Sequence, residues 1–334
     1  MTLAQEAGLT VSRHEHRRRI EEKLRRELGP VIGALLNDPA VIEIMLNPDG
    51  TLWVERFGAS MEPVGHLGAA AALSLMGTVA STLDTSITAL NPILECELPL
   101  DKSRFEALIP PVVSAPAFTI RKKALRVFTL DDYVSSRIMT PAQCAAIRAA
   151  VASRLNILVV GGTGSGKTTL TNAIIHEMSQ ACPNDRLTII EDTGELQCAA
   201  RNVVTLRAVD HVDMTRLLKA TMRLRPDRIV VGEVRDGAAL ALLKAWNTGH
   251  PGGAATVHAN SARAGLVRLE QLVAEASQAP MQSLIAEAID LIVAIAKAPR
   301  AGRRISEIVT VEGYGGGAYL TTQLEGQDNA GSDL

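Results

Sequence analysis

The pattern of apolar positions divides the chain into two parts, and the first part carries the signals of short strands. Two runs rich in β-branched and apolar residues, 41–46 and 51–55, flank an Asn-Pro-Asp-Gly turn, which predicts a β-hairpin. An Ala- and Leu-rich segment at 69–83 predicts a helix, and short strands interrupted by prolines follow over 103–123. Residues 29–123 are therefore expected to form a small α+β domain.

The second part alternates apolar runs with helical segments. Buried strands are predicted at 156–160, 187–190 and 228–231, and a helix is predicted at 168–180. Strands that alternate with helices predict a parallel sheet with helices on both faces, and ligands bind such sheets at the carboxyl ends of the strands. Residues 141–322 are expected to form this α/β domain.

A charged helix is predicted for residues 1–28. Ile20, Leu24 and Leu28 are spaced four residues apart and give the helix one thin apolar stripe, and Gly29-Pro30 ends it. Two interpretations stay open. The helix is either solvated and packed on its own domain, or it is a basic helix that contacts acidic lipid head groups or a partner.

Two further segments are expected to lie outside the folded domains. Residues 124–140 carry few periodic signals and are predicted to be a linker, which ends where Thr140 and Pro141 mark a helix start. Residues 323–334 are polar and contain glycine, so they are predicted to be a disordered tail.

Composition narrows both the fold and the partners. Of the 334 residues, 47% are hydrophobic but only 3% are aromatic, so the cores of two domains must be built from Ala, Leu, Ile and Val, which suits α/β layers. The net charge of −2 provides no global basic field, and direct binding to nucleic acid is therefore not expected.

Cysteine spacing and hydropathy indicate the compartment. The four cysteines are not spaced as C-x-x-C, which disfavours a zinc knuckle and fits reduced thiols. The N-terminus lacks the apolar core of a signal peptide, and apolar runs such as 291–296 are too short to span a bilayer. The protein is expected in the cytoplasm, where any membrane contact would be peripheral.

The strongest chemical signal is a phosphate-binding loop at 161–168, which matches G-x-x-x-x-G-K-[ST] at every defined position, follows an apolar strand and opens a helix. Its glycines allow a backbone path that aims several N–H groups at one phosphate, and the helix N-terminus adds its dipole. Lys167 is expected to reach the β- and γ-phosphates of ATP, Thr168 to bind Mg²⁺, and Thr169 to support the α-phosphate. The predicted nucleotide-binding residues are Gly161, Gly162, Thr163, Gly164, Ser165, Gly166, Lys167, Thr168 and Thr169.

Acidic residues follow two of the other predicted strands. Glu233 comes just after the strand at 228–231 and is expected to hold Mg²⁺ through water or to polarise the attacking water, the alternative being an ordinary strand-end carboxylate. Three carboxylates within 191–195 repel one another unless a cation is near. Glu191 and Glu195 are the candidates there for Mg²⁺ or water positioning, the alternative being an acidic surface turn.

These motifs occur in an order that resembles the secretion and traffic ATPases, which drive type II secretion, type IV pili and type IV secretion. The resemblance is carried by the phosphate loop and by the segments 191–195, 222–235 and 256–260. The run Ala-Trp-Asn-Thr-Gly-His-Pro-Gly-Gly at 245–253 looks most like the conjugal-transfer branch, the TrbB-like ATPases. The resemblance extends over about residues 30–320.

The resemblance implies a RecA-like P-loop motor domain of the α/β class, preceded by a smaller PAS-like α+β domain. It further implies a ring of six chains, with ATP between the two domains of each. Lys167 and Thr168 then match the phosphate and Mg²⁺ ligands, and Glu233 matches the catalytic glutamate. His258, which taken alone would more often be structural, matches a histidine that senses the γ-phosphate.

The family's first domain also supplies arginines to the γ-phosphate. Arg121, in Phe-Thr-Ile-Arg, and Arg104, in Ser-Arg-Phe, fit that pattern. A guanidinium fork suits the charge that develops on a transferred phosphoryl group. Arg223 and Arg225 are further candidates, facing a neighbouring site. Without the resemblance Arg121 and Arg104 would be taken as surface charge.

One departure from the family pattern narrows the function. Relatives of the extending kind carry a four-cysteine zinc insertion that this sequence lacks, which favours the type IV secretion or retraction branches. The predicted function is a hexameric ATPase that powers assembly of, or substrate transfer through, a conjugative type IV secretion system. Its partners would be other components of that machinery, with peripheral contact at the cytoplasmic face of the inner membrane. The alternatives are a pilus-retraction motor, a DNA-binding RecA-like motor, a nucleotide-gated scaffold and a small-molecule P-loop kinase.

Overall fold

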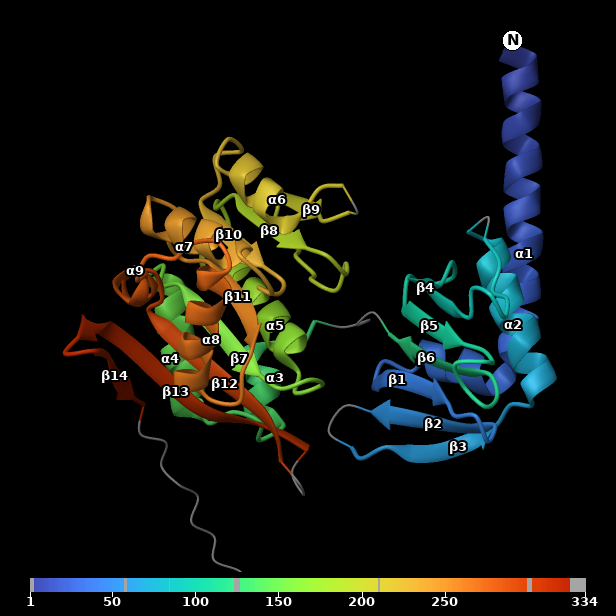
Figure 1. The fold of residues 1–334 in the computed structure, drawn as a ribbon, viewed down its shortest axis with the longest axis horizontal. Coiled ribbons are helices and arrows are strands. Elements are labelled where there is room, and N and C mark those ends of the chain that lie inside the picture. Colours follow the sequence, from blue (N-terminus) through green and yellow to red (C-terminus); the bar gives the residue numbers. More distant parts are fainter. Residues whose placement is uncertain are drawn as a thin grey trace, which may run out of the picture. The chain divides into compact units, whose positions relative to one another are not determined.

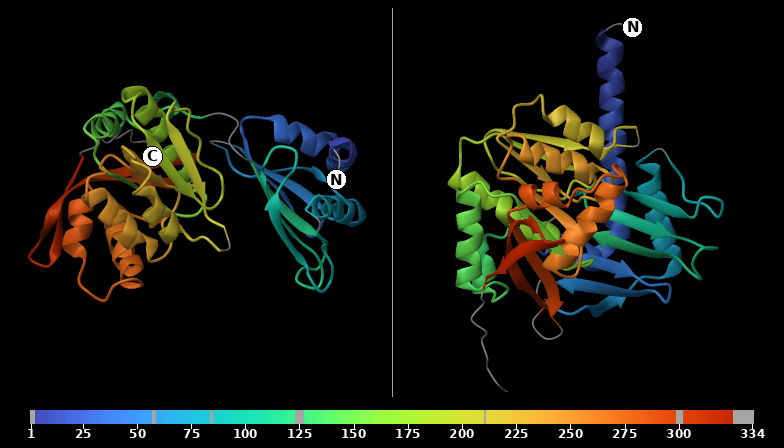
Figure 2. Two further views of the ribbon diagram at one scale, coloured as in Figure 1. Left: turned by 90° about the horizontal axis from the view of Figure 1, so that it is seen from above. Right: turned by 60° about the vertical axis from the view of Figure 1, so that its left-hand side comes forward.

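The computed structural model describes residues 3–56, 59–83, 85–122, 127–209, 211–298 and 302–324, with side chains from residue 18 onward. The chain forms two compact units, residues 1–126 and 127–334 (Figure 1). Both units are seen from further sides in Figure 2. Within the described ranges, no helix combines the length and apolarity needed to cross a membrane.

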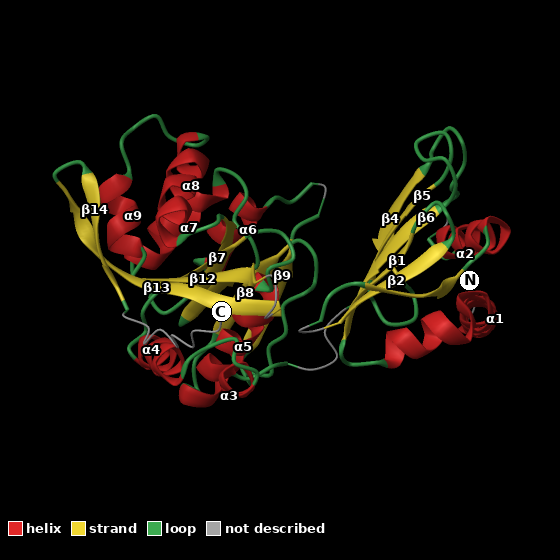
Figure 3. Cartoon of the chain, turned by 90° about the horizontal axis from the view of Figure 1, so that it is seen from below, coloured by secondary structure: helices red, strands yellow, loops and turns green. Residues whose placement is uncertain are grey.

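The first unit is an antiparallel sheet with two helices on one face (Figure 3). Its strand order is β3-β2-β1-β6-β5-β4. The strands are β1 (Val41–Leu46), β2 (Thr51–Arg56), β3 (Glu62–His66), β4 (Ile93–Glu97), β5 (Arg104–Leu108) and β6 (Ala117–Arg121), and the helices are α1 (Leu3–Asn37) and α2 (Ala69–Ser81). The predicted small α+β domain is confirmed in its class.

The predicted hairpin is β1 and β2, joined by the turn at 47–50. Leu46 faces Leu52 across the pair, and Asp49 Oδ1 accepts a hydrogen bond of 2.8 Å from the backbone N–H of Thr51. Gly50 has a φ of 83°, a left-handed conformation that glycine adopts without strain. The turn residues therefore set the register in which apolar side chains of both strands face the core.

Helix α1 is interrupted where the sequence predicted its end. Gly29 has non-helical dihedral angles, φ 67° and ψ 177°, and a second helical segment continues from Pro30 to Asn37. Leu24, Leu28 and Ile32 are buried in the core of the first unit. This part of the helix, from Leu24 to Ile32, therefore packs on its own domain, as the first of the two interpretations predicted. The lipid-binding alternative concerns residues 13–28, whose side chains are described only from residue 18.

The second unit is an eight-stranded sheet of order β14-β13-β12-β7-β11-β10-β8-β9. Six neighbouring strands from β12 to β9 are parallel, and β13 and β14 extend the sheet as an antiparallel edge that the sequence did not predict. The strands are β7 (Ile157–Gly161), β8 (Leu187–Glu191), β9 (Val203–Arg207), β10 (Arg228–Val231), β11 (Ala254–His258), β12 (Leu291–Ala298), β13 (Gly302–Gly315) and β14 (Ala318–Gln323).

Helices cover both faces of this sheet (Figure 3). One group consists of α3 (Leu130–Ser135), α4 (Pro141–Ala152) and α5 (Lys167–Ala181). The other consists of α6 (Met214–Thr221), α7 (Ala238–Asn247), α8 (Ala262–Ala274) and α9 (Gln282–Ala288). The predicted α/β architecture with a parallel sheet between two helical layers is confirmed.

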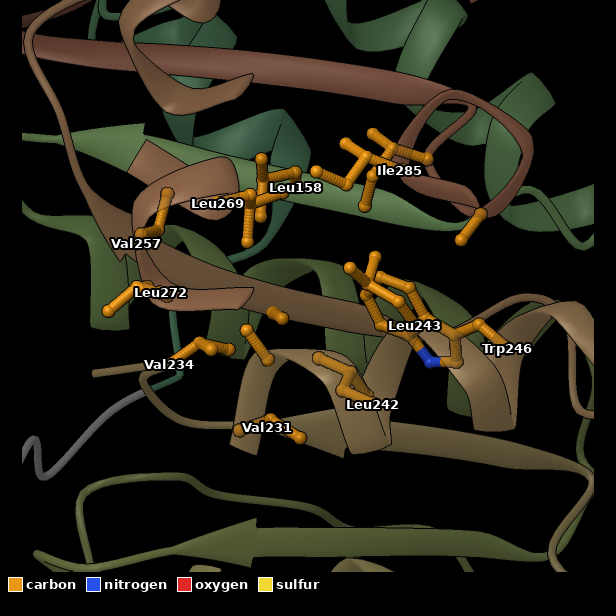
Figure 4. Packing of buried hydrophobic residues seen from close by; sticks show 14 of the residues in the cluster. Leu158, Val231, Val234, Leu242, Leu243, Trp246, Val257, Leu269, Leu272 and Ile285 are labelled. Atoms are coloured by element: carbon orange, nitrogen blue, oxygen red, sulfur yellow. The ribbon is translucent and has the colours of Figure 1, made fainter. Parts of the chain in front are cut away.

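The core under the second helical layer is almost wholly aliphatic (Figure 4). Leu158 and Val257 project from the strands toward Leu269 of α8 and Leu243 of α7 in the same buried cluster. Trp246 is the large aromatic member, and its indole N–H donates 3.2 Å to the carbonyl of Ile229. Strands β7, β8 and β10 are buried at every position, as expected for strands covered on both faces.

Part of the segment predicted as a linker, 124–140, is helical. Helix α3 lies inside it and begins with a capping box in which Thr129 and Asp132 each bond the backbone N–H of the other. Leu130 and Tyr133 are buried, and α3 packs against α4 and α5. A helix of six residues is too short to show a periodic apolar pattern, so its one signal in the sequence is the Thr-x-x-Asp spacing of the capping box. Residues 123–126 and 325–334, which include most of the predicted tail, lie outside the described residues.

Candidate active site

The predicted site residues of the second unit meet where neighbouring parallel strands end. His258, the last residue of β11, is the register partner of Gly161, the last residue of β7. On the other side of β11, the N–H of Gly232 donates 2.8 Å to Ile190 O, which places Glu233 beside the end of β8. The carboxyl ends of β7, β11, β10 and β8 thus form one continuous edge that carries the phosphate loop and the acidic residues.

The phosphate loop joins β7 to α5, as predicted. Gly164 and Gly166 have φ values of 66° and 97°, which glycine adopts readily and other residues rarely do. A Cβ atom at position 161 would lie 2.4 Å from Ser165 Oγ and 2.5 Å from Ile295 O. The loop is therefore packed so tightly at its first residue that only glycine fits.

Lys167 is folded into the loop that it follows. Its ammonium group donates to the carbonyl oxygens of Gly161 and Gly162 at 2.9 Å and 3.1 Å. Only 8% of the residue is exposed, although it is a lysine. The same nitrogen lies 3.3 Å from Nδ1 of His258. Lys167 therefore stands between the loop and the end of β11, where incoming phosphate oxygens would compete for its protons.

The loop is also supported from the antiparallel edge of the sheet. Arg303 of β13 donates to Gly164 O through Nε at 3.4 Å and through Nη2 at 3.2 Å, and it is 7% exposed. A Cβ atom at Gly166 would lie 3.0 Å from Arg303 Cδ, and one at Gly164 would lie 3.0 Å from Lys297 Nζ. Two basic residues far along the chain thus lie directly against the phosphate loop.

Glu233 is held by both of its carboxylate oxygens. Oε1 lies 2.7 Å from Nε2 of His258, and Oε2 accepts a bond of 2.6 Å from Nη2 of Arg235. The other end of the guanidinium, Nη1, donates 2.7 Å to Oδ2 of Asp192. Asp192, Glu233 and Arg235 form the acidic corner of the site. A chain of polar contacts therefore runs from Lys167 through His258 to this corner.

His258 is neutral in this chain of contacts. Partial burial and the nearby Lys167 ammonium lower the pKa of its imidazole, against the opposing effect of Glu233. A neutral imidazole has one nitrogen that donates and one that accepts. Because Lys167 has only protons to offer, Nδ1 is the acceptor, and Nε2 carries the proton that is donated to Glu233.

The acidic residues at the end of β8 and just after it have different surroundings. Glu191 is buried, and its Oε2 accepts a bond of 2.9 Å from the N–H of Leu196, which holds the following loop. Asn172 donates to the backbone oxygen of Glu195 at 3.2 Å. The member that contacts Arg235 is Asp192, which sequence reasoning had not selected. The catalytic roles predicted for Glu191 and Glu195 stay predictions.

Arg104 and Arg121 are brought together in the first unit. They are direct register partners on β5 and β6, on the face opposite the buried Phe105 and Ile120. Like charges directly opposite each other are unfavourable in a sheet, but carboxylates continue the row on both sides. Glu43 pairs with Arg121, and Glu97 pairs with Arg104. Contact of these arginines with the γ-phosphate, like the roles of the exposed Arg223 and Arg225, stays a prediction.

Sequence reasoning missed four residues that the structure places at the site: Asp192, Arg235, Lys297 and Arg303. Arg235 lay inside a recognised motif but had no partner that a linear sequence identifies. For Lys297 the available signal was that a basic residue directly follows the apolar run 291–296, and Arg303 lies in the basic segment shortly after it. An apolar strand that ends in a lysine, in a sheet that already carries a phosphate loop, would have been the basis for selecting Lys297, whereas Arg303 belongs to the next strand, which was not predicted.

Residues 26–306 match the family model described as "Type II/IV secretion system protein". The chain is 58% identical over 301 residues to a "Probable conjugal transfer protein TrbB" of Sinorhizobium fredii, which covers 90% of this chain and 92% of that protein. It is 57% identical over 303 residues to "Conjugal transfer protein TrbB" of Rhizobium radiobacter, covering 91% and 94% of the two chains. "Protein VirB11" of Agrobacterium fabrum is 31% identical over 317 residues, covering 82% and 90%.

Two solved structures share the fold. The Legionella pneumophila ATPase DotB has a TM-score of 0.60 at 20% identity, with 82% of this chain and 78% of that chain covered. The pilus retraction motor PilT with bound ADP has a TM-score of 0.56 at 19% identity, with 86% and 80% covered. The predicted RecA-like fold and the predicted TrbB-like resemblance are confirmed. The chain belongs to the type II/IV secretion system protein family, as the match over residues 26–306 shows.

Proposed function

We propose that this protein is a hexameric ATPase that hydrolyses ATP with Mg²⁺ to power assembly of, or substrate transfer through, a conjugative type IV secretion system. The observation that carries the proposal is the chain of contacts Lys167–His258–Glu233, which joins a phosphate loop to a strand-end carboxylate. It occurs in a chain 58% identical to a conjugal transfer protein. Such a chain of contacts links the place where phosphate binds to the place where water would be activated.

The phosphate loop supplies the binding step. Its backbone N–H groups and the N-terminus of α5 favour an anion. Lys167 exchanges its contacts with two loop carbonyls and His258 for phosphate oxygens. Thr168, half-buried in the first turn of α5, is placed to contact Mg²⁺.

Mg²⁺ fits this set of residues. The part of the chain that the structure describes holds no group of three or more His, Cys, Asp or Glu side chains arranged to enclose a metal ion. Mg²⁺ bound with a nucleotide needs no such group, because phosphate oxygens and waters supply most of its ligands. Thr168, with Glu233 acting through water, would hold it. When bound, it draws negative charge from the phosphate oxygens.

Glu233 supports the chemical step. Its carboxylate accepts a proton from water as the water oxygen forms a bond to the γ-phosphorus, and the bond from that phosphorus to the β–γ bridging oxygen breaks. The products are ADP and inorganic phosphate. Arg121 and Arg104, supplied by the first unit, stabilise the charge on the transferred phosphoryl group. When inorganic phosphate leaves, the arginines would lose the group that they bind, and we expect this loss to be coupled to movement.

Assembly and location follow from the same family resemblance. Six chains form a ring, and the other components of the secretion machinery are its partners. The protein acts in the cytoplasm, peripherally at the cytoplasmic face of the inner membrane. The particle mass of the full chain, measured by light scattering with and without ATP and Mg²⁺, tests the ring. A mass of one or two chains under both conditions contradicts it.

The site is tested by Lys167→Ala. We expect steady-state phosphate release to fall at least about 100-fold, because a charge that stabilises the transferred phosphoryl group is lost. Lys244→Ala removes an exposed lysine of α7 and is the matched control, expected to hydrolyse ATP at the parent rate. Circular dichroism and thermal unfolding establish that both variants are folded. A folded Lys167→Ala protein with the parent rate would rule out the site.

A further inference from the structure

The acidic corner is bridged by one guanidinium. Arg235 uses Nη2 for Glu233 at 2.6 Å and Nη1 for Asp192 at 2.7 Å, so one planar group joins the residues that follow β10 and β8. Its side chain is 53% exposed, whereas that of Glu233 is 15% exposed. Arg235 is therefore the solvent-exposed member of this pair, and Glu233 is the more buried one.

An exposed ion pair ordinarily contributes little to stability. The ion pair between Arg235 and Glu233 has a different effect, because it fixes the orientation of the Glu233 carboxylate. With Oε2 on Arg235 and Oε1 on His258, Glu233 has each of its oxygens bonded to a different neighbour. Without Arg235 the carboxylate would turn about its last bond, and its distance to an attacking water would vary.

We propose that Arg235 is a positioning residue for Glu233, and that Asp192 anchors Arg235 for this role. The inference rests on the proposed function, in which Glu233 accepts the proton of the attacking water. Asp192 is itself held, because Arg207 Nε donates to its backbone oxygen at 3.3 Å. Asp192, after β8, therefore holds Arg235, and Arg235 in turn holds the carboxylate of Glu233, after β10.

The shape of the guanidinium matters as much as its charge. Its N–H groups lie in one plane and in fixed directions, so it bonds two carboxylates at once, whereas a lysine ammonium acts as a point charge on a flexible stem. Lysine at position 235 would keep the charge but lose one of the two contacts. Arg235→Lys is therefore expected to retain only part of the parent rate.

If Arg235 positions Glu233, its loss should slow ATP turnover but leave nucleotide binding unchanged. Within the ranges that the structure describes, Arg235 makes hydrogen bonds to Glu233 and Asp192 and none to the phosphate loop. Arg235→Ala is therefore expected to lower kcat about 10- to 100-fold, the size of effect that misplaced catalytic groups produce. KM for ATP and Kd for ADP should stay within about twofold of the parent.

The experiment measures steady-state phosphate release and ADP binding on the full chain for four variants. These are Arg235→Ala, Arg235→Lys, Asp192→Asn and, as the matched control, Arg304→Ala, which removes an exposed arginine of β13. Asp192→Asn is nearly isosteric and loses the anchor, so it tests the proposal independently of how well the alanine variant folds. The double variant Arg235→Ala with Asp192→Asn should be no slower than Arg235→Ala, because both changes remove the same support.

Chemical rescue separates positioning from a general structural defect. The side chain of Arg235 is accessible, so added guanidinium chloride at low millimolar concentration should restore part of the kcat of Arg235→Ala, whereas ammonium chloride should not. A kcat within twofold of the parent for Arg235→Ala overturns the proposal, as does an equal loss of turnover and ADP affinity. If the parent protein releases phosphate no faster than Lys167→Ala, the proposed function fails, and this inference fails with it.

Discussion

The phosphate loop and the acidic corner lie at two ends of the same chain of contacts, but they are built in opposite ways. The loop is one continuous stretch whose path is set by its glycines and by the absence of side chains at places such as Gly161. The corner is made by three side chains from two strand ends and depends on the fork of Arg235. Binding should therefore depend on the loop, and turnover on the corner.

The largest test of this division is Glu233→Gln. The amide cannot accept the proton of the attacking water, so kcat should fall about 100- to 10,000-fold. Binding of ADP, measured by calorimetry, should be unchanged because the loop is intact. Loss of ADP binding in a folded Glu233→Gln protein would show that the corner also serves affinity, and the division would break.

Arg303→Met tests the phosphate loop, and we expect it to have an intermediate effect, on nucleotide binding. Methionine keeps much of the apolar volume but loses the donors to Gly164 O, which hold the loop in its left-handed turn. Hydrogen bonds from a charged donor contribute about 1.5–3 kcal/mol, so Kd for ADP should rise about 10-fold or more. Arg304→Met, at the exposed neighbour on the same strand, is the control. A change in kcat with no change in Kd would reverse the assignment.

The smallest effect concerns His258, which connects the two ends. Its pKa is lowered in the folded protein, so the unfolded chain binds a proton more readily as pH falls below about 6.5. Stability contributed by neutral His258 is complete above that pH and is lost progressively as pH falls toward the folded pKa. Thermal unfolding at pH 7.5 and 5.5 should therefore show a smaller pH-dependent loss for His258→Asn than for the parent. An equal loss in both proteins would mean that His258 does not titrate in this way.

The same contrast explains how far the sequence could lead. Every residue of the phosphate loop was predicted, because its motif is contiguous and its chemistry is local. Glu233 could be placed approximately, since the carboxyl ends of parallel strands share one edge. His258 was selected only through the family resemblance, because no strand was predicted to end at it. Arg235 and Asp192 could not be paired, because they are separated by 43 positions and meet only when β8 and β10 lie side by side.

Arg303 shows a second limit of sequence reasoning. It reaches the phosphate loop from β13, an antiparallel strand next to the edge strand β14 of a sheet that was predicted as parallel. The short helix α3 was missed for a related reason, since six residues hold its capping box but no periodic apolar stripe. Tertiary packing places Arg303, and it adds to the local capping box in forming α3.

The neutral imidazole of His258 can accept only one hydrogen bond. It offers a single lone pair, on Nδ1, and in this structure Lys167 occupies it. If a bound phosphate took Lys167 away, as proposed, that lone pair would be open to one proton and no more. A proton that arrived there while Nε2 lost its own would leave two acceptors facing each other at Glu233, and attraction would become repulsion. The tautomer of one imidazole ring would therefore decide whether its contact with Glu233 is attractive or repulsive.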